Sequence, residues 1–348
     1  MFKEDFSKSI EYLNKNACDA ILLRLNRDIL ETSQDFSTYK ENIIKDKKVQ
    51  TALSWQKKDG YFGDYFHGGW IPENKKIKSS KAMEAALILL HEMGFEAKDD
   101  FISKALKSLL KKDFNKSWTS WDIYSPEQGL YGDDYERALL FAYFGIEDKD
   151  FIKKEIDRAI NSMKILAGLN DLKEAYYVKN NQTFYVKGKA LPDLYQLKLL
   201  AYTKKWRSHE NLEIIKSAVD KLISFSPLPD IYIMYKGQKI APAKLSRLDF
   251  NKDTNDYDDI DWYQFFSMYE LLGRLDLLKC NEVLKNNTEK LINYLEENDG
   301  LFLKPVKHKC FKVWGCYSGL MLSNNWSKKN RICDLTYRSL AIIKYLYE

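Results

Sequence analysis

The sequence predicts an all-α fold in which about five to six helical hairpins close into an (α/α) barrel. One supporting observation is a phrase that occurs twice, as Gln56-Lys-Lys-Asp-Gly-Tyr-Phe-Gly63 and as Glu297-Asn-Asp-Gly-Leu-Phe302, each after an amphipathic segment. Asp-Gly supplies a residue that can take positive φ and end a helix, and the aromatic can fold back onto the helix end. The second observation is an alternation of more polar and less polar helical segments along the chain.

The elements follow in order along the chain. Residues 2–32 are expected to form one or two helices that cap the ring, because apolar residues recur there at helical spacing. Outer helices, with Lys and Glu beside an apolar stripe, are predicted around 40–57, 100–112, 149–167, 210–225 and 281–297. Inner helices, buried on more than one side, are predicted around 81–93, 134–144, 193–205, 261–272 and 334–347. Three of the inner segments are expected to stop at a glycine, namely Gly94, Gly145 and Gly273. The sequence thus predicts a single domain over 1–348, with capping helices in 1–35 and helical pairs in 36–348.

The composition limits the classes of function. Aromatic residues make up 14% of the 348 residues, more than helix packing needs, so rings are expected to line an interior space. The net charge of +5 comes from 55 basic and 50 acidic residues mixed along the chain, which argues against a nucleic-acid partner. Five cysteines without CxxC spacing argue against a disulfide framework and favour the cytoplasm. No apolar window is long enough to span a membrane, and no nucleotide-binding or hydrolase motif is present.

Two motifs and the helical alternation carry a family resemblance. The Gln56 phrase resembles the QW phrase of terpenoid cyclases, and the alternation is similar to the α/α toroid that these enzymes share with protein prenyltransferase β subunits. Segments 191–206 and 334–344 look most like a poorly characterised bacterial branch of that superfamily, described as squalene cyclase-like. The resemblance implies that the chain binds an apolar, isoprenoid-like molecule in a central cavity, with terpene cyclase-like or prenyltransferase-like chemistry.

The sharpest catalytic candidate is the run Asp256-Tyr257-Asp258-Asp259, which matches the Asp-x-Asp-Asp signature of class II terpene cyclases. Clustered carboxylates repel one another, so one of them can be kept protonated. By resemblance Asp258 would protonate an alkene or epoxide, while Asp256 and Asp259 orient it. The alternative interpretation is a solvated acidic loop that caps the following helix. A third interpretation is a Ca²⁺ loop, although the glycine and terminal glutamate of an EF-hand are missing.

A zinc site is the runner-up to the prediction of no cofactor. Gly315-Cys316-Tyr317-Ser318 matches part of the zinc-binding phrase of protein prenyltransferases, and His308 and Cys310 lie just before it. Trp314 stands where that family has its ligand Asp, and no His follows Cys316, so the family's site cannot be carried over intact. The alternative is that these cysteines are buried packing residues.

A ligand-binding set is predicted on the inner helices, where their faces converge. It consists of Tyr135, Arg137, Tyr195, Trp262, Tyr263, Phe266, Tyr337 and Arg338. These side chains either line a cavity or fill it completely. Two further functions stay open from the sequence. One is a carbohydrate-active barrel, with Asp133, Asp134, Glu136 and the 256–261 cluster as candidate acids. The other is a non-catalytic repeat module that binds an unidentified protein.

Overall fold

The computed structural model describes residues 2–70, 81–111, 124–125, 128–131 and 133–347. The chain divides into two compact units. Unit 1 comprises Met1–Thr119, Tyr257–Gly273 and Lys285–Glu348, and unit 2 comprises Ser120–Asp256 and Arg274–Leu284. The single domain over 1–348 stays a prediction, and each unit is described by itself.

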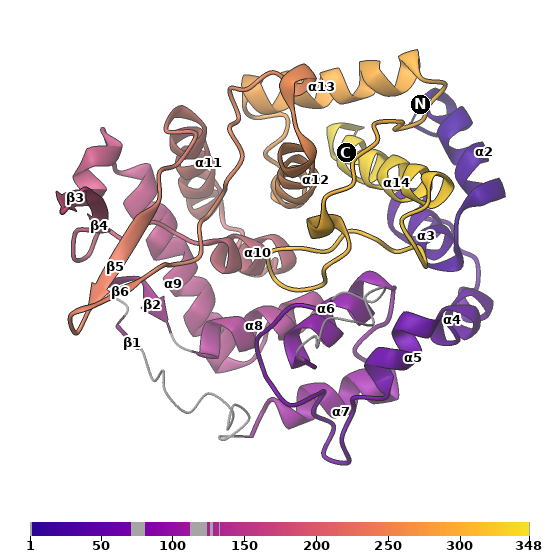
Figure 1. The fold of residues 1–348 in the computed structure, drawn as a ribbon, viewed down its shortest axis with the longest axis horizontal. Coiled ribbons are helices and arrows are strands. Elements are labelled where there is room, and N and C mark those ends of the chain that lie inside the picture. The colour runs from indigo at the N-terminus through magenta and orange to yellow at the C-terminus, as the bar shows by residue number, and fades with distance from the viewer. Residues whose placement is uncertain (1, 71–80, 112–123, 126–127, 132, 348) are drawn as a thin grey trace. The chain divides into compact units, whose positions relative to one another are not determined.

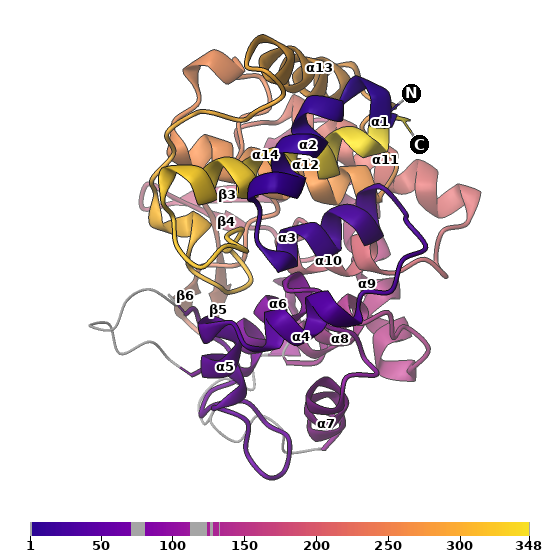
Figure 2. The same ribbon diagram turned by 90° about the vertical axis from the view of Figure 1, so that its right-hand side faces the viewer.

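Unit 1 is built from helices taken from both ends of the chain. Its elements are α1 (Phe2–Asp5), α2 (Ser7–Asn16), α3 (Asp19–Arg24), the π-helix η1 (Leu25–Ile29), α4 (Ser37–Ile44), α5 (Lys47–Leu53), α6 (Met83–Glu92), α7 (Asp100–Ser108), α12 (Asp259–Arg274), α13 (Glu282–Glu297), η5 (Lys309–Phe311) and α14 (Lys328–Tyr347). The C-terminal α14 packs against α2 and α3, and the chain ends lie close together, with the rings of Phe2 and Tyr347 5.4 Å apart (Figures 1 and 2). Every residue of α6 except His91 is buried, so this helix lies in the core.

Unit 2 combines four long helices with a small sheet. Its elements are β1 (Tyr124–Ser125), β2 (Leu130–Tyr131), α8 (Asp133–Tyr143), α9 (Asp150–Ala167), η3 (Leu172–Ala175), β3 (Tyr176–Lys179), β4 (Gln182–Tyr185), α10 (Leu194–Tyr202), α11 (His209–Ser224), β5 (Ile231–Tyr235), β6 (Gln238–Ile240) and η4 (Thr254–Asp256). Helix α9 packs against α8, α10 and α11. The larger sheet has the order β3-β4-β5-β6, with β4 and β5 parallel and the other neighbours antiparallel (Figure 1).

The predicted all-α fold class is wrong, because the chain contains this mixed four-stranded sheet and a second pair of strands. The strands of the larger sheet lie in 176–185 and 231–240, where the sequence analysis expected connections between helices. Aromatic and β-branched residues fill them, and both Asn180 and Asn181 have positive φ, as a two-residue hairpin turn requires. The local signal for a hairpin was therefore present in the sequence.

The predicted helical segments are confirmed, since each contains a helix. The outer segment 40–57 is split into α4 and α5, and α14 starts earlier than expected. Gly300 of the repeated phrase has a φ of 81° and its N–H donates to the Leu295 carbonyl, which confirms its role at the end of α13. Gly60 has a φ of 94° but closes a turn with Lys57 beyond the end of α5, so its predicted role as a helix stop is wrong. The predicted stop at Gly273 is wrong, because α12 continues to Arg274. A Cβ at Gly273 would lie 2.2 Å from the Tyr345 ring, so this glycine allows α12 and α14 to pack closely.

Candidate functional site

The predicted acidic cluster is divided between the two units. Asp256 is exposed and ends η4 of unit 2, whereas Asp258 and Asp259 belong to unit 1. Asp258 Oδ1 accepts hydrogen bonds from the backbone N–H groups of Ile260 at 2.7 Å and Asp261 at 2.9 Å. Asp261 Oδ2 in turn accepts from the Asp258 N–H at 3.1 Å. This reciprocal pattern is a helix N-cap, as the alternative interpretation expected.

Asp259 also has a backbone role. Its Oδ2 accepts from the N–H groups of Lys307 at 2.7 Å and His308 at 2.9 Å, which joins α12 to the segment before η5. Both hydrogen bonds to Asp259 thus serve to join two backbone segments. The catalytic role of Asp256, Asp258 and Asp259 stays a prediction.

The residues of the runner-up zinc site make local hydrogen bonds or are buried. His308 Nδ1 accepts from the Cys310 N–H at 3.3 Å, which caps η5, and Cys316 is buried. Burial raises the pKa of the Cys310 thiol to about 12, so it is protonated at neutral pH. In the described part of the chain, no three His, Cys, Asp or Glu residues are grouped as metal ligands would be. A zinc site at His308, Cys310 and Cys316 stays a prediction.

The predicted ligand-binding set does not form one group. Tyr135, Arg137 and Tyr195 belong to unit 2, and the other five belong to unit 1.

Within unit 1, Trp262 and Phe266 pack against Phe302, with ring centroids 5.0 Å and 5.1 Å away. The ring of Tyr263 meets that of Phe311 edge to face at 5.6 Å. These rings fill the interior of unit 1 around α12.

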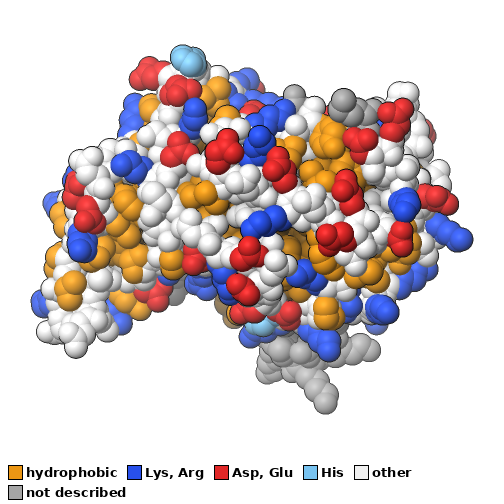
Figure 3. Space-filling model, turned by 90° about the horizontal axis from the view of Figure 1, so that it is seen from above, with side chains coloured by type: hydrophobic (Ala, Val, Ile, Leu, Met, Phe, Trp, Pro, Cys, Tyr) orange, Lys and Arg blue, Asp and Glu red, His pale blue; other side chains and the backbone are white. Residues whose placement is uncertain are grey.

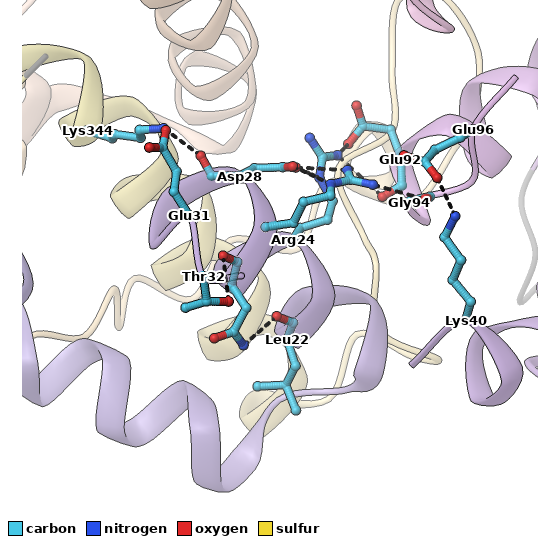
Figure 4. Close-up of polar contacts among 12 residues, drawn as sticks. Leu22, Arg24, Asp28, Glu31, Thr32, Lys40, Glu92, Gly94, Glu96 and Lys344 are labelled. Atoms are coloured by element: carbon cyan, nitrogen blue, oxygen red, sulfur yellow. Dashed lines mark hydrogen bonds and ion pairs between the residues drawn. The ribbon is translucent and has the colours of Figure 1, made fainter. Parts of the chain in front are cut away.

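Tyr337 and Arg338 lie in a buried ionic cluster that the sequence analysis did not identify. Arg338 contacts Glu92 at 2.7 Å and Glu270 at 3.1 Å, and Arg24 contacts the same Glu92 at 2.6 Å. Figure 4 shows Arg24 between Glu92 and Asp28, which is 3.0 Å away. Burial alone would raise the pKa of Glu92, but the two guanidinium groups outweigh it and lower the pKa. Glu92 therefore stays charged at ordinary pH values.

A second group of perturbed carboxyls lies in unit 2, between α8 and α9. Glu155 of α9 is 2% exposed, and burial raises the pKa of its carboxyl to about 7. Arg158 donates to its Oε1 and lowers that pKa, while the Asp134 carboxylate on α8 raises it. The Glu155 Oε2 is buried and has no hydrogen-bond partner among the described residues. A substantial fraction of Glu155 is thus protonated at neutral pH.

Asp134 stands in a different environment. Its side chain is 49% exposed and its Oδ1 accepts from Arg137 at 2.7 Å. Arg137 also stacks its guanidinium 4.0 Å from the centre of the Phe151 ring, which fixes its direction. A buried acid and an ion-paired carboxylate in electrostatic contact are a combination in which one group can donate a proton while the other stays charged.

Asp193 and two tyrosines complete this part of unit 2. Asp193 is 6% exposed and caps α10, accepting from the Gln196 N–H at 2.9 Å. Burial raises the pKa of its carboxyl to about 7, against the hydrogen bonds from Gln196, Tyr195 and the Tyr135 side chain. The rings of Tyr135 and Tyr195 lie 5.2 Å apart. We call Asp134, Tyr135, Arg137, Glu155 and Asp193 the carboxyl site.

The sequence analysis named three members of the carboxyl site but missed Glu155 and Asp193. A signal for Glu155 existed, since it stands three residues after Ile152 and four before Ala159, on the apolar stripe of α9. A charged residue on such a stripe is buried with it. The signal for Asp193 was the pairing with Gln196 three residues later, a capping box at the start of α10.

Three further findings concern the surface charge, the length of the apolar helices and the comparison with known proteins. On the face drawn in Figure 3, basic and acidic side chains are interspersed. No helix in the described ranges is long and apolar enough to cross a membrane. Comparison of the chain with models of protein families, with curated proteins and with solved structures finds no match.

Proposed function

We propose that the protein cleaves glycosidic bonds by general acid–base catalysis at the carboxyl site of unit 2. The pair of Glu155 and Asp134 supports this function most directly, because their surroundings differ so strongly. Glu155 is buried and its pKa of about 7 leaves a substantial fraction of it protonated at neutral pH, whereas Asp134 is half exposed and paired with Arg137. Glycoside hydrolysis needs one carboxylic acid and one carboxylate beside the same bond.

The chemistry assigns one role to each carboxyl. Glu155 donates its proton to the bridging oxygen as the bond from that oxygen to the anomeric carbon breaks. Asp134 takes a proton from a water molecule whose oxygen forms the new bond to that carbon, so one water is consumed in each cycle. Proton exchange with solvent then restores both groups. Arg137 positions Asp134, and the Asp193 carboxyl positions Tyr135 through their hydrogen bond.

The test is turnover of a panel of oligosaccharides and nitrophenyl glycosides by the full-length protein. We expect Glu155→Gln to lower kcat by about a hundredfold or more, because an amide cannot donate the proton. The matched control is Glu213→Gln, which removes an exposed carboxylate on the neighbouring helix α11 and should leave kcat unchanged. Absence of turnover across the panel, or equal rates for both variants, contradicts the proposal.

Other predictions stand beside this proposal without new support. Binding of an isoprenoid-like molecule and acid-initiated chemistry at Asp258 depend on the family resemblance. A cytoplasmic location and the lack of a nucleic-acid partner depend on the cysteine and charge content.

A further inference from the structure

We infer that one face of the β3–β6 sheet in unit 2 binds an acidic polysaccharide, which names the substrate class for the carboxyl site and so rests on the proposed function. The face consists of Tyr177, Lys179, Phe184, Tyr232 and Lys239, and we call it the aromatic–lysine face. Tyr177 pairs with Phe184 across β3 and β4, and Phe184 pairs with Tyr232 across β4 and β5. Directly paired residues point to the same side of a sheet, so the three rings form one row.

The rings make a continuous platform across three strands. Tyr177 and Phe184 stack with centroids 5.8 Å apart, and Phe184 and Tyr232 follow at 6.2 Å. Tyr177 is 42% exposed, Tyr232 is half-buried, and Phe184 is buried between them. On the opposite face Ile231 and Ile233 are buried, whereas Val178 of β3 is 65% exposed. The accessible parts of the row are therefore the Tyr177 ring and the half-buried Tyr232 ring, and such rings suit the apolar faces of sugars, which aromatic walls hold in carbohydrate sites.

The charge on this face is of one sign. Lys179 lies two residues after Tyr177, on the same side of β3, and the ammonium of Lys239 sits 4.4 Å from the centre of the Tyr232 ring. Neither lysine forms an ion pair with a described residue. The four strands contain no Asp or Glu at all. The face is therefore complementary to an anionic chain, in contrast to the mixed charges elsewhere on the protein.

Polar side chains at the edge of the platform complete the fit to a sugar. Gln182 follows the Asn180-Asn181 turn and shares the side of β4 that carries Phe184. Amide groups donate to and accept from hydroxyls, and the lysines pair with carboxylate or sulfate groups. An acidic polysaccharide offers all three features at every unit or two: an apolar ring face, hydroxyls and a negative charge.

The experiment measures binding apart from turnover, in affinity gels that contain either polygalacturonate or neutral amylose, with Glu155→Gln protein to prevent cleavage. We expect binding to polygalacturonate that weakens with salt, and binding to amylose weaker by about tenfold. Tyr177→Ala should lower the affinity by about threefold to tenfold. Lys179→Glu and Lys239→Glu should each lower it by about fivefold. The control is Lys164→Glu on α9, an exposed lysine away from the sheet, which should change it by less than about twofold.

Three results would overturn the inference. They are equal binding to amylose, an equal loss in Lys164→Glu and Lys179→Glu, and tighter binding of a labelled oligodeoxythymidine to the same face than of polygalacturonate. Failure of the proposed function looks different. If the aromatic–lysine face binds polygalacturonate as expected but wild-type protein cleaves no glycan, the carboxyl site loses its assigned role while the binding face keeps its own.

Discussion

Replacing Asp193 by Asn should remove a pH-dependent loss of folding stability in unit 2. Burial raises the pKa of this carboxyl from 3.8 to about 7, so the folded state prefers the protonated form. Asn keeps the cap, because its side-chain oxygen accepts from the Gln196 N–H as the carboxyl does, and it never ionises. The two proteins therefore differ only in the cost of ionising residue 193 in the folded state.

The sign and size follow from linkage. Below about pH 3 the carboxyl is protonated in both the folded and the unfolded state, and the two proteins should be equally stable. As pH rises, the unfolded chain ionises first, so the stability of the wild type falls until the folded carboxyl ionises near pH 7. A shift of about three pKa units corresponds to about 4 kcal/mol. Asp193→Asn should thus be more stable than wild type by about 4 kcal/mol at pH 8 and by almost nothing at about pH 3.

The measurement is urea denaturation at several pH values, combined with hydrogen exchange of the α10 amides, which reports on unit 2 alone. Asp171→Asn is the matched control, because Asp171 forms the same kind of capping box with Glu174 but is exposed. Its difference from wild type should stay below about 1 kcal/mol throughout. An Asp193→Asn advantage that is the same at pH 5 and pH 8, or larger at pH 5, would refute the reasoning.

Three further predictions concern Glu155, Lys48 and Asp258. If Glu155 donates the proton, kcat should fall as pH rises past about 7, and this limb should be absent from the residual activity of Glu155→Gln; a rate that rises through this range contradicts the assignment. Lys48 is buried in unit 1 and donates to the carbonyls of residues 322 and 323, so Lys48→Met should lower the free energy of unfolding by about 3 kcal/mol, against less than about 0.5 kcal/mol for exposed Lys47→Met. For Asp258, a cap role predicts that Asn costs under about 0.5 kcal/mol and Ala about 1 kcal/mol in thermal unfolding. Formation of a cyclised product from squalene or geranylgeranyl diphosphate that Asp258→Asn abolishes, seen by mass spectrometry, would instead support acid-initiated chemistry there.

The helices could be predicted from the sequence because their signal is local. An apolar stripe at helical spacing and a charged outer side lie within one segment, as in α9, α11 and α13, and α13 is followed by the Asp299-Gly300 stop. The hairpin of β3 and β4 also had a local signal in Asn180-Asn181, and only the expectation of a helical repeat set it aside. Gly273 misled for a different reason. A glycine that ends a helix and one that lets two helices approach look the same in sequence, and Tyr345, which decides the matter, is 72 residues away.

The carboxyl site shows where prediction from the sequence stops. Asp134, Tyr135 and Arg137 were noticed because polar residues stood at the start of an inner helix. Their chemistry depends on Glu155, whose pKa is set by how much water the folded chain excludes from it. The apolar stripe of α9 indicates that Glu155 is buried, but not which helix covers it. The sequence indicates which side of a helix is buried. It does not indicate which group from another segment will contact a buried carboxyl and shift its pKa.

The buried ionic cluster of unit 1 shows that the need to balance charge limits which residues can be partners of a buried charged side chain. Arg24, Glu92, Glu270 and Arg338 come from four different helices, and all four are buried. An unpaired buried charge costs several kcal/mol, so each must meet an opposite charge from another segment. The two glutamates meet this requirement for the two arginines. Glu92 is the centre because it accepts from both arginines, so Glu92→Gln should destabilise unit 1 more than Glu270→Gln, which loses one ion pair. Equal thermal unfolding of the two variants would mean that the arginines are satisfied by other groups, such as the Leu320 carbonyl that Arg338 also contacts at 3.2 Å.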